Sequence, residues 1–405
     1  MAGQTVWETA GMGDGASVVV VGGGVMGCSI AFHLAERGVE VLLLERDTVC
    51  SGMSARSGAL IRTHYTNAPE ARLALVGLAY FRDWRERVGG WCGFTVTGAA
   101  ILVGPHDAER LRRNVAMLRG LGADTEVATP GELAAEHPEL DPRGVGLAAV
   151  EPGSGYADPV ATTFAFASRA VDLGARIRQG VAVHAIRVAG DRVTGLETSD
   201  GEVGADAVVL ACGPWVDPLA RTAGFELGIT PERSQLAFFR RPDGARRHPL
   251  VIDGVLGTYF RPHGGELSLI GVEAGHHVEV DAIDREVEGY DHQLVAPALQ
   301  RVAGRVPAFA GAPFARGHRG VYDTSPDSRA VLDAAPGVAG LFVAGGFSGT
   351  GFKKAPAVGA CMAELVTEGL AATVDIRPFR LGRFADGEPI VGDEYRLAAE
   401  FGHKL

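Results

Sequence analysis

A glycine-rich run near the N-terminus has the spacing of a phosphate-binding loop. Residues 22–27, Gly-Gly-Gly-Val-Met-Gly, fit the pattern G-x-G-x-x-G. The first glycine allows a tight turn, the second lets a pyrophosphate approach the backbone, and the third permits close helix–strand packing. An acidic residue at the end of the next apolar run can accept hydrogen bonds from ribose hydroxyls. A glycine-rich tight turn is the simpler alternative, but the flanking pattern predicts a dinucleotide site that includes Gly22, Gly24, Val25, Met26, Gly27 and Glu45.

A second glycine-rich segment lies late in the chain and carries positive charge. Residues 345–354 read Gly-Gly-Phe-Ser-Gly-Thr-Gly-Phe-Lys-Lys. Its glycines would let the backbone lie against a flat ring system, although a turn that begins the next helix explains them equally well. With the N-terminal position of the fingerprint, this segment favours FAD over NAD. The chain has only three lysines, and two of them, Lys353 and Lys354, lie here.

The segments around these motifs have the patterns of a parallel α/β sheet. Residues 17–21 are a β-branched run without alternation, which is typical of a strand buried on both faces. Helical spacing over 25–37 and a second buried strand over 41–45 complete a strand–turn–helix–strand unit. Later apolar runs predict helices over 162–173 and 355–369 and strands over 174–177, 193–198, 207–211 and 340–345.

Two intervening regions, 93–103 and 234–280, alternate apolar and polar residues as antiparallel strands do. The predicted fold class is therefore α/β, a Rossmann-type FAD-binding domain with an inserted antiparallel-sheet (α+β) substrate domain. The FAD-binding domain is predicted in three parts and the substrate domain in two. Their boundaries are 17–90, 146–225 and 319–384 for the former, 91–145 and 226–318 for the latter, and 1–16 and 385–405 for the tails.

Composition excludes several classes of protein. The net charge is −11, from 38 Lys+Arg and 49 Asp+Glu, which argues against a partner such as nucleic acid or a membrane surface. The five cysteines contain no Cys-x-x-Cys pair, so the sequence predicts neither a disulfide framework nor a metal site. Residues 1–16 lack the pattern of a secretory signal, and no apolar run reaches bilayer length. We expect a cytoplasmic protein, and the oligomeric state stays open.

Several motifs, taken in order along the chain, resemble those of one family. They include Leu-Ile-Arg-Thr-His-Tyr at 60–65, Glu-Pro-Gly-Ser-Gly at 151–155, Ala-Cys-Gly-Pro-Trp at 211–215 and Tyr-Phe-Arg-Pro at 259–262. Together with both glycine-rich segments, they make residues 17–384 resemble the flavin-dependent amine oxidoreductases of the D-amino-acid oxidase superfamily. Within it, the chain is similar to sarcosine oxidase and dimethylglycine dehydrogenase-like enzymes.

The resemblance implies an extended FAD with its isoalloxazine ring at the domain interface. Some members of the superfamily attach the flavin through a cysteine two residues before a tyrosine. Those positions are Gly320 and Tyr322 here, so the FAD is expected to be noncovalent. Beyond the fingerprint, the cofactor-binding residues implied by the resemblance are Arg46, Ser51, Ser57, Gly58, Val183, Cys212, Gly213, Trp215, Gly346, Gly349, Thr350, Gly351, Phe352 and Lys353.

The resemblance also implies oxidation of a C–N bond in an amino acid or secondary amine. Hydride passes from the substrate to flavin N5, and the resulting imine is hydrolysed by water. Arg62 matches the position that binds the substrate carboxylate, and Lys353 matches its partner; an arginine fork and a lysine point charge suit that role. The candidates for the environment of the amine include His64, Tyr259 and Glu273.

Two departures from the family leave the electron acceptor open between oxygen and another molecule. The lysine that activates oxygen in sarcosine oxidases corresponds to Leu269, and a hydrogen-bonding histidine of that region corresponds to Glu273. We favour an oxidase over a dehydrogenase because paired lysines persist in an arginine-rich chain. Two other functions stay open: a flavin enzyme acting on a hydroxy acid or a biosynthetic tailoring intermediate, and a nonenzymatic FAD-binding assembly factor.

Overall fold

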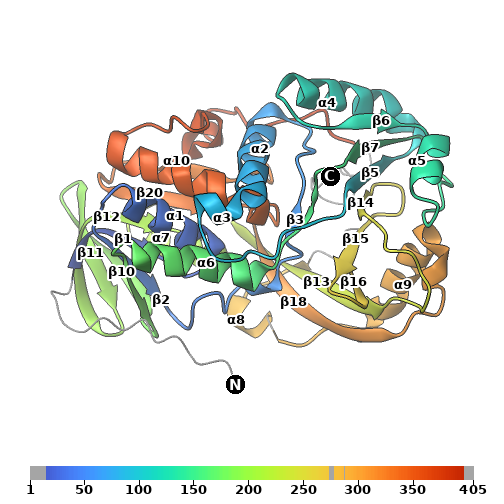
Figure 1. Ribbon diagram of the computed structural model, residues 1–405. Helices are drawn as coiled ribbons and strands as arrows, with labels where there is room; N and C mark the ends of the chain where they lie inside the picture. Colours follow the sequence, from blue (N-terminus) through green and yellow to red (C-terminus); the bar gives the residue numbers. More distant parts are fainter. Residues whose placement is uncertain (1–14, 273–277, 287, 396–405) are drawn as a thin grey trace.

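The computed structural model describes residues 15–272, 278–286 and 288–395 (Figure 1). The described chain forms two large sheets, one with eight strands and one with nine. It also forms a small three-stranded sheet. The small sheet consists of β3 (Leu60–Ile61), β8 (Gly155–Tyr156) and β4 (Thr95–Val96). The predicted fold class is confirmed.

The eight-stranded sheet is assembled from three separated parts of the chain, as predicted. Its parallel strands follow the spatial order β9 (Arg176–Gln179), β2 (Val41–Glu45), β1 (Gly15–Val21), β12 (Gly201–Leu210) and β20 (Leu341–Gly345). Antiparallel strands extend it: β10 (Val183–Ala189) and β11 (Arg192–Thr198) beside β12, and β19 (Val331–Ala334) beside β20.

Both faces of the parallel strands are covered, which explains their continuous apolar sequence. Val18 and Val20 of β1 belong to a core formed with α1 (Val25–Glu36), α6 (Pro159–Asp172) and α10 (Ala355–Glu368). Val19 and Val21 belong to a second core that includes β11 and α7 (Val216–Arg221). Figure 1 shows α1, α6 and α10 together over the sheet, and no helix within the described ranges is long and apolar enough to cross a membrane.

The nine-stranded sheet lies beside this domain, on the right of Figure 1. It contains β5 (Ala99–Val103), β6 (Glu126–Ala128), β7 (Leu147–Glu151), β13 (Thr230–Arg240), β14 (Leu250–Asp253), β15 (Thr258–His263), β16 (Leu267–Val272), β17 (Val278–Glu279) and β18 (Phe314–Thr324). The helices of this part are α4 (Ala108–Gly120), α5 (Pro130–Glu136), α8 (Ile283–Glu286) and α9 (Val295–Arg305), while α2 (Ala68–Arg82) and α3 (Trp84–Arg87) precede it.

The structure corrects the predicted alternation in 93–103. Every residue of β5 is buried, because one face packs in a core with α9 and the other in a core with α4. The strand also pairs parallel with β14, although it is antiparallel to β7. Burial on two faces removes the polar positions that an exposed face would require.

The predicted segment boundaries also change. Strands β7 and β18 belong wholly to the nine-stranded sheet, so the boundaries predicted at 146 and 319 cut into that sheet. Strand β1 begins at Gly15, inside the predicted N-terminal tail. The prediction of a tail from 385 is wrong for its described part, because Tyr395 is 1% exposed and packs in the core beside α4.

A buried ion pair links α9 to the nine-stranded sheet and generates a stability prediction. Arg305 Nε lies 2.6 Å from Asp253 Oδ2, and both side chains are almost completely buried. Replacing Arg305 with Met leaves the Asp253 carboxylate buried without its cation. We expect the free energy of unfolding, measured by urea denaturation, to fall by about 3–5 kcal/mol.

The matched control is Arg143→Met, which breaks an exposed pair with Asp141 in the neighbouring loop. That variant should keep nearly the wild-type unfolding midpoint. An Arg305→Met protein as stable as wild type would show that burial of this pair does not stabilise the domain.

Candidate active site

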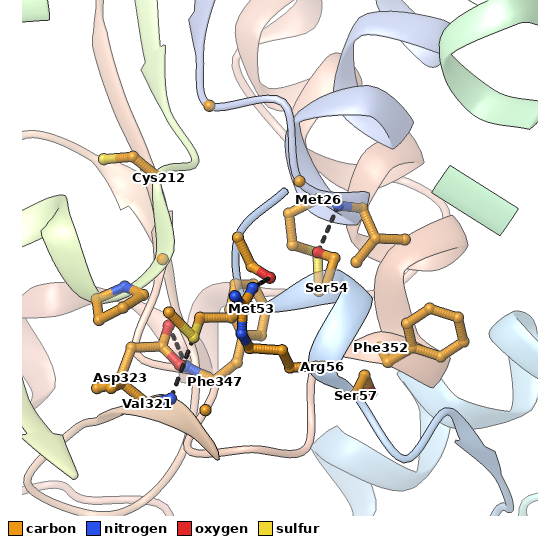
Figure 2. Close-up of a pocket in the computed structure, with 18 of the residues that line it drawn as sticks. Met26, Met53, Ser54, Arg56, Ser57, Cys212, Val321, Asp323, Phe347 and Phe352 are labelled. Carbon is orange, nitrogen blue, oxygen red and sulfur yellow. Dashed lines mark hydrogen bonds between the residues drawn. The ribbon is translucent and has the colours of Figure 1, made fainter. Parts of the chain in front are cut away.

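One cavity lies between the two sheets and is lined by residues of both glycine-rich segments and of the motifs at 60–65, 211–215 and 259–262. Its volume is about 440 Å³, within the range of about 300–1,000 Å³ that is common for small-molecule sites. Of the predicted cofactor-binding residues, all except Gly27 and Gly346 line it. Figure 2 shows a close-up of this cavity.

The glycines at its first end leave a cradle that side chains would fill. Gly22 has φ +110°, and a Cβ there would lie 2.6 Å from the carbonyl oxygen of Ala211, which directly follows β12. A Cβ on Gly27 would lie 1.9 Å from the Gly22 carbonyl oxygen, so Gly27 sets the approach of α1 rather than lining the cavity. The Glu45 carboxylate accepts hydrogen bonds from the backbone N–H groups of Gly23 at 2.6 Å and Asp47 at 2.9 Å. This carboxylate therefore holds the turn in place beside the end of β2.

An aromatic and charged group lies at the same end. The Arg46 guanidinium stacks over the Trp215 ring at 4.7 Å, and Asp284 of α8 binds both side chains, at 2.9 and 3.2 Å. Burial raises the pKa of the nearby Cys212 to about 12, so its thiol stays protonated at neutral pH. These groups and Val183 form a wall suited to the adenosine end of a dinucleotide.

The loop between β2 and β3, which carries the predicted Ser51 and Ser57, also lines the cavity with residues between these two. Ser54 Oγ accepts a hydrogen bond from the Val25 N–H at the start of α1, at 2.9 Å (Figure 2). Arg56 donates to the carbonyl oxygens of Ser51 and Gly52, at 2.6 and 2.8 Å, and so fixes the loop. The Val321 N–H lies 3.1 Å from the sulfur of Met53.

The late glycine-rich segment forms the central wall. A Cβ on Gly349, whose φ is +75°, would lie 2.6 Å from the Tyr322 ring, and one on Gly351 would lie 2.8 Å from Phe347. Phe352 lines the cavity and also stacks on Phe81, with the ring centres 6.0 Å apart. The ring is therefore both part of the cavity wall and part of the aromatic core. Gly346 lies outside the lining, where its φ of +69° shapes the turn.

A buried carboxylate follows Tyr322 and was not predicted as a site residue. Asp323 lines the cavity, and its Oδ2 accepts a hydrogen bond from the Phe347 N–H at 3.1 Å (Figure 2). Burial raises the pKa of Asp323 to about 6. This acid therefore links β18 to the glycine-rich segment at the centre of the cavity.

Arg62 and Lys353, which we call the cation pair, meet on one aromatic ring at the other end of the cavity. Both line the cavity, and their charged groups lie 4.8 and 5.6 Å from the centre of the Tyr65 ring. Lys353 Nζ donates to the Tyr65 hydroxyl at 3.2 Å, and burial lowers the pKa of Lys353 to about 8. Burial alone would raise the pKa of Tyr65, but the surrounding cations, Lys353 first, lower it to about 8.

The two adjacent lysines have different surroundings. Lys354 is completely buried, and its Nζ lies 2.6 Å from Glu70 Oε1 and 2.8 Å from Thr350 Oγ1. Glu70 also pairs with Arg329 at 2.9 Å. Burial opposes ionisation of Glu70, but Lys354 and Arg329 outweigh it and lower the pKa of Glu70 to about 2. Lys354 is therefore neutralised by Glu70, and Lys353 is the lysine that lines the cavity.

The remaining predicted residues divide. Tyr259 lines the cavity, whereas Glu273 lies outside the described residues. The expectation that His64 faces the substrate is corrected: its ring is buried away from the cavity, with Nε2 hydrogen-bonded to the Tyr395 hydroxyl at 2.7 Å. Burial, with Arg62 nearby, lowers the pKa of His64 to about 3, so the ring is neutral. Leu269 is 1% exposed and lies behind the wall at Gly58.

A glycine cradle, a helix start and an acid at the end of β2 fit a dinucleotide, and the central wall fits a flat ring. The family model described as FAD dependent oxidoreductase (DAO) matches residues 17–365. The chain belongs to the DAO family. FAD is accordingly its cofactor, and the residues of the cavity fit it.

Named relatives and solved structures agree with this membership. The chain is 31% identical to 4-methylaminobutanoate oxidase (formaldehyde-forming) of Paenarthrobacter nicotinovorans, over 89% of this chain and 45% of that protein, so it spans about half of that relative's length. It is 30% identical to glycine oxidase of Geobacillus kaustophilus, over 90% of this chain and 96% of that protein. The crystal structure of L-proline dehydrogenase from P. horikoshii superposes with a TM-score of 0.87 at 26% identity, covering 94% and 100% of the two chains.

The surroundings of Gly320 generate a prediction about how this DAO-family protein holds FAD. Gly320 lines the cavity on β18, opposite Arg56 and Met53, and Cys212 is the one cysteine among the lining residues of the described chain. Cys212 lies near Glu45 and Asp323. We expect acid precipitation of the purified protein to release all of its flavin into the supernatant, as measured by absorbance. A washed, denatured pellet that stays yellow would contradict noncovalent binding.

Proposed function

We propose that this protein oxidises the C–N bond of an amino acid or secondary amine that carries a carboxylate. The observation that supports the proposal most is the cation pair. Arg62 follows β3 and Lys353 precedes α10, yet both line one end of the cavity against the same tyrosine ring. Two buried cations on one wall favour an anionic group in their vicinity. A guanidinium fork can bind a carboxylate through two hydrogen bonds, and the lysine adds a point charge.

The rest of this end suits the carbon skeleton of a small amine. Leu60, Leu236, Ile252 and Tyr259 contribute mainly apolar surface to the lining. With its carboxylate held at the cation pair, a substrate would place its α-carbon and nitrogen toward the central wall. The positive charge of the pair lowers the pKa of the substrate ammonium, which favours the neutral amine needed for oxidation. FAD, when bound along the central wall, supplies the hydride acceptor.

The names of the relatives support a carboxylated amine as the substrate class. A methylaminobutanoate and glycine, which occur in the names of two of them, each combine an amine with a carboxylate. The chain covers under half of the first of these proteins, so the activity remains our proposal for this chain.

The cation pair predicts how carboxylate binding responds to substitution and to pH. Lys353→Met and Arg62→Ala should each weaken binding of an amine-free carboxylic acid, followed by the flavin spectrum, by about 2 kcal/mol, or ~30-fold. In wild type, binding should weaken as the pH rises above about 8, because Lys353 then loses its proton and Tyr65 loses its own. In Lys353→Met, the loss of affinity above pH 8 should be smaller than in wild type, because only Tyr65 then titrates there.

Tyr65→Phe is the matched control, since it keeps the ring under the cations but removes the second group that titrates near pH 8. It should bind the acid at neutral pH nearly as well as wild type and keep the step that belongs to Lys353. All three variants should retain FAD. Wild-type affinity in Arg62→Ala and Lys353→Met would exclude the cation pair as the carboxylate site.

We further propose oxygen as the electron acceptor, with Lys353 as the cation that stabilises the negative charge developing on it. Leu269 offers no charge at the position of the family lysine, and Lys354 is neutralised by Glu70. A cation acts more strongly in a buried site than in water. Lys353→Met should therefore slow reoxidation of the reduced protein by oxygen at least ~10-fold in stopped-flow measurements.

Reoxidation of the same variant by an artificial one-electron dye serves as the control and should be unchanged. A fast reaction with oxygen that does not depend on Lys353 would show that this lysine does not activate oxygen. A slow reaction in wild type, with fast transfer to the dye, would make the protein a dehydrogenase instead.

A further inference from the structure

The last described residues of the chain bind the segment that carries Arg62. We call residues 393–395 the C-terminal strap. The Asp393 N–H donates to the Thr66 carbonyl oxygen at 3.0 Å, and the Tyr395 hydroxyl is hydrogen-bonded to His64 Nε2 at 2.7 Å. The His64 and Tyr395 rings also stack at 6.0 Å. Two of the three strap residues therefore contact the 64–66 segment directly.

The strap is itself fixed at two further points. Asp393 binds α4, with its carboxylate 2.7 Å from Arg113 and its carbonyl oxygen accepting from Asn114 at 3.0 Å. Glu394 pairs with Arg329 at 2.6 Å, and Arg329 in turn pairs with Glu70. Asp393 thus joins the strap to α4, Glu394 joins it to Arg329, and Tyr395 joins it to His64 in the segment after β3.

Arg62 is connected to the strap through one residue. An Nη1 hydrogen of Arg62 is donated to the carbonyl oxygen of His64, so the position of the His64 backbone sets where the guanidinium lies. The His64 ring is neutral and completely buried, and its Nε2 is held by Tyr395. Tyr395 is in turn immobilised in the core that contains Tyr259, Leu269 and Leu236. Displacement of Tyr395 would let His64 shift and would carry the acceptor of Arg62 with it.

We propose that Tyr395 is a positioning residue for carboxylate recognition, acting through His64 on Arg62. The proposal rests on the proposed function, because it assigns Arg62 to the substrate carboxylate. Tyr395 itself does not line the cavity, so it acts on a substrate only through other residues. The strap therefore makes the C-terminal segment a structural part of the substrate site.

The test is a double-mutant cycle on the FAD-loaded, full-length protein. Tyr395→Phe removes only the hydroxyl and keeps the ring in the core. We expect the KM for a carboxylated secondary amine, with sarcosine as the probe, to rise on the order of tenfold, while kcat and FAD affinity stay unchanged. In an Arg62→Ala background, the same substitution should have no further effect, because the two residues act on one interaction.

Two controls separate positioning from a general loss of structure. Tyr290→Phe removes a tyrosine hydroxyl elsewhere in the substrate domain and should leave the KM unchanged. Benzylamine, an amine without a carboxylate, should bind Tyr395→Phe and wild type equally, as measured through the flavin spectrum. Three results would each overturn the proposal. The KM could be unchanged in Tyr395→Phe, or it could rise as much in the Arg62→Ala background as in wild type. Tyr395→Phe could also bind benzylamine more weakly than wild type does.

Failure of the proposed function gives a different result. If wild type neither oxidises nor binds any carboxylated amine, the carboxylate role of Arg62 is wrong and the strap proposal falls with it. If wild type binds such amines and Tyr395→Phe binds them equally well, only the role of the strap is wrong.

Discussion

The carboxylate of Glu70 allows several cations to be buried at one end of the cavity. It pairs with Lys354 and Arg329, and the ring of Tyr65 lies against Arg62, Lys353 and Lys354. Removing a partner from a buried ion pair costs about 3–5 kcal/mol, because the remaining charge is left uncompensated. Segment 350–354 is therefore linked to one anion on α2 through Lys354, and segment 393–395 through Arg329 and Glu394. The geometry of the proposed carboxylate site follows from that constraint.

The same constraint explains why adjacent lysines do different work. Lys354 is committed to Glu70 and Thr350, so its charge serves the fold. Lys353 contacts the tyrosine hydroxyl and lines the cavity, where its charge is available to a ligand. A short 3-10 turn at 352–354 points the two side chains in these different directions. The local backbone thus divides one pair of residues between stability and recognition.

The cavity joins two chemically different ends because the two sheets meet along it. The dinucleotide end is shaped by backbone, with glycines at positions where a side chain would collide with a neighbouring strand. The proposed substrate end is shaped by side chains from both sheets, mostly apolar apart from the cation pair. By the resemblance, Leu269 and Gly320 stand where some members of the family have a lysine and a linking cysteine. In the proposed function, the chemistry of this end depends on the charges of Arg62 and Lys353.

The sequence by itself determined the parallel sheet, the glycine cradle and most of the predicted cofactor-binding residues that line the cavity. These features are local: a β-branched run, a turn that only glycine can adopt, and a helix directly after it. The sequence did not determine that His64 turns away from the cavity, that β5 is buried on both faces, or that 393–395 closes behind Arg62. Each of these depends on a partner distant in the chain, such as Tyr395 for His64, and periodicity within a segment carries no information about such a partner. Only tertiary packing decided that Lys354 is neutralised by Glu70 and that Lys353 lines the cavity.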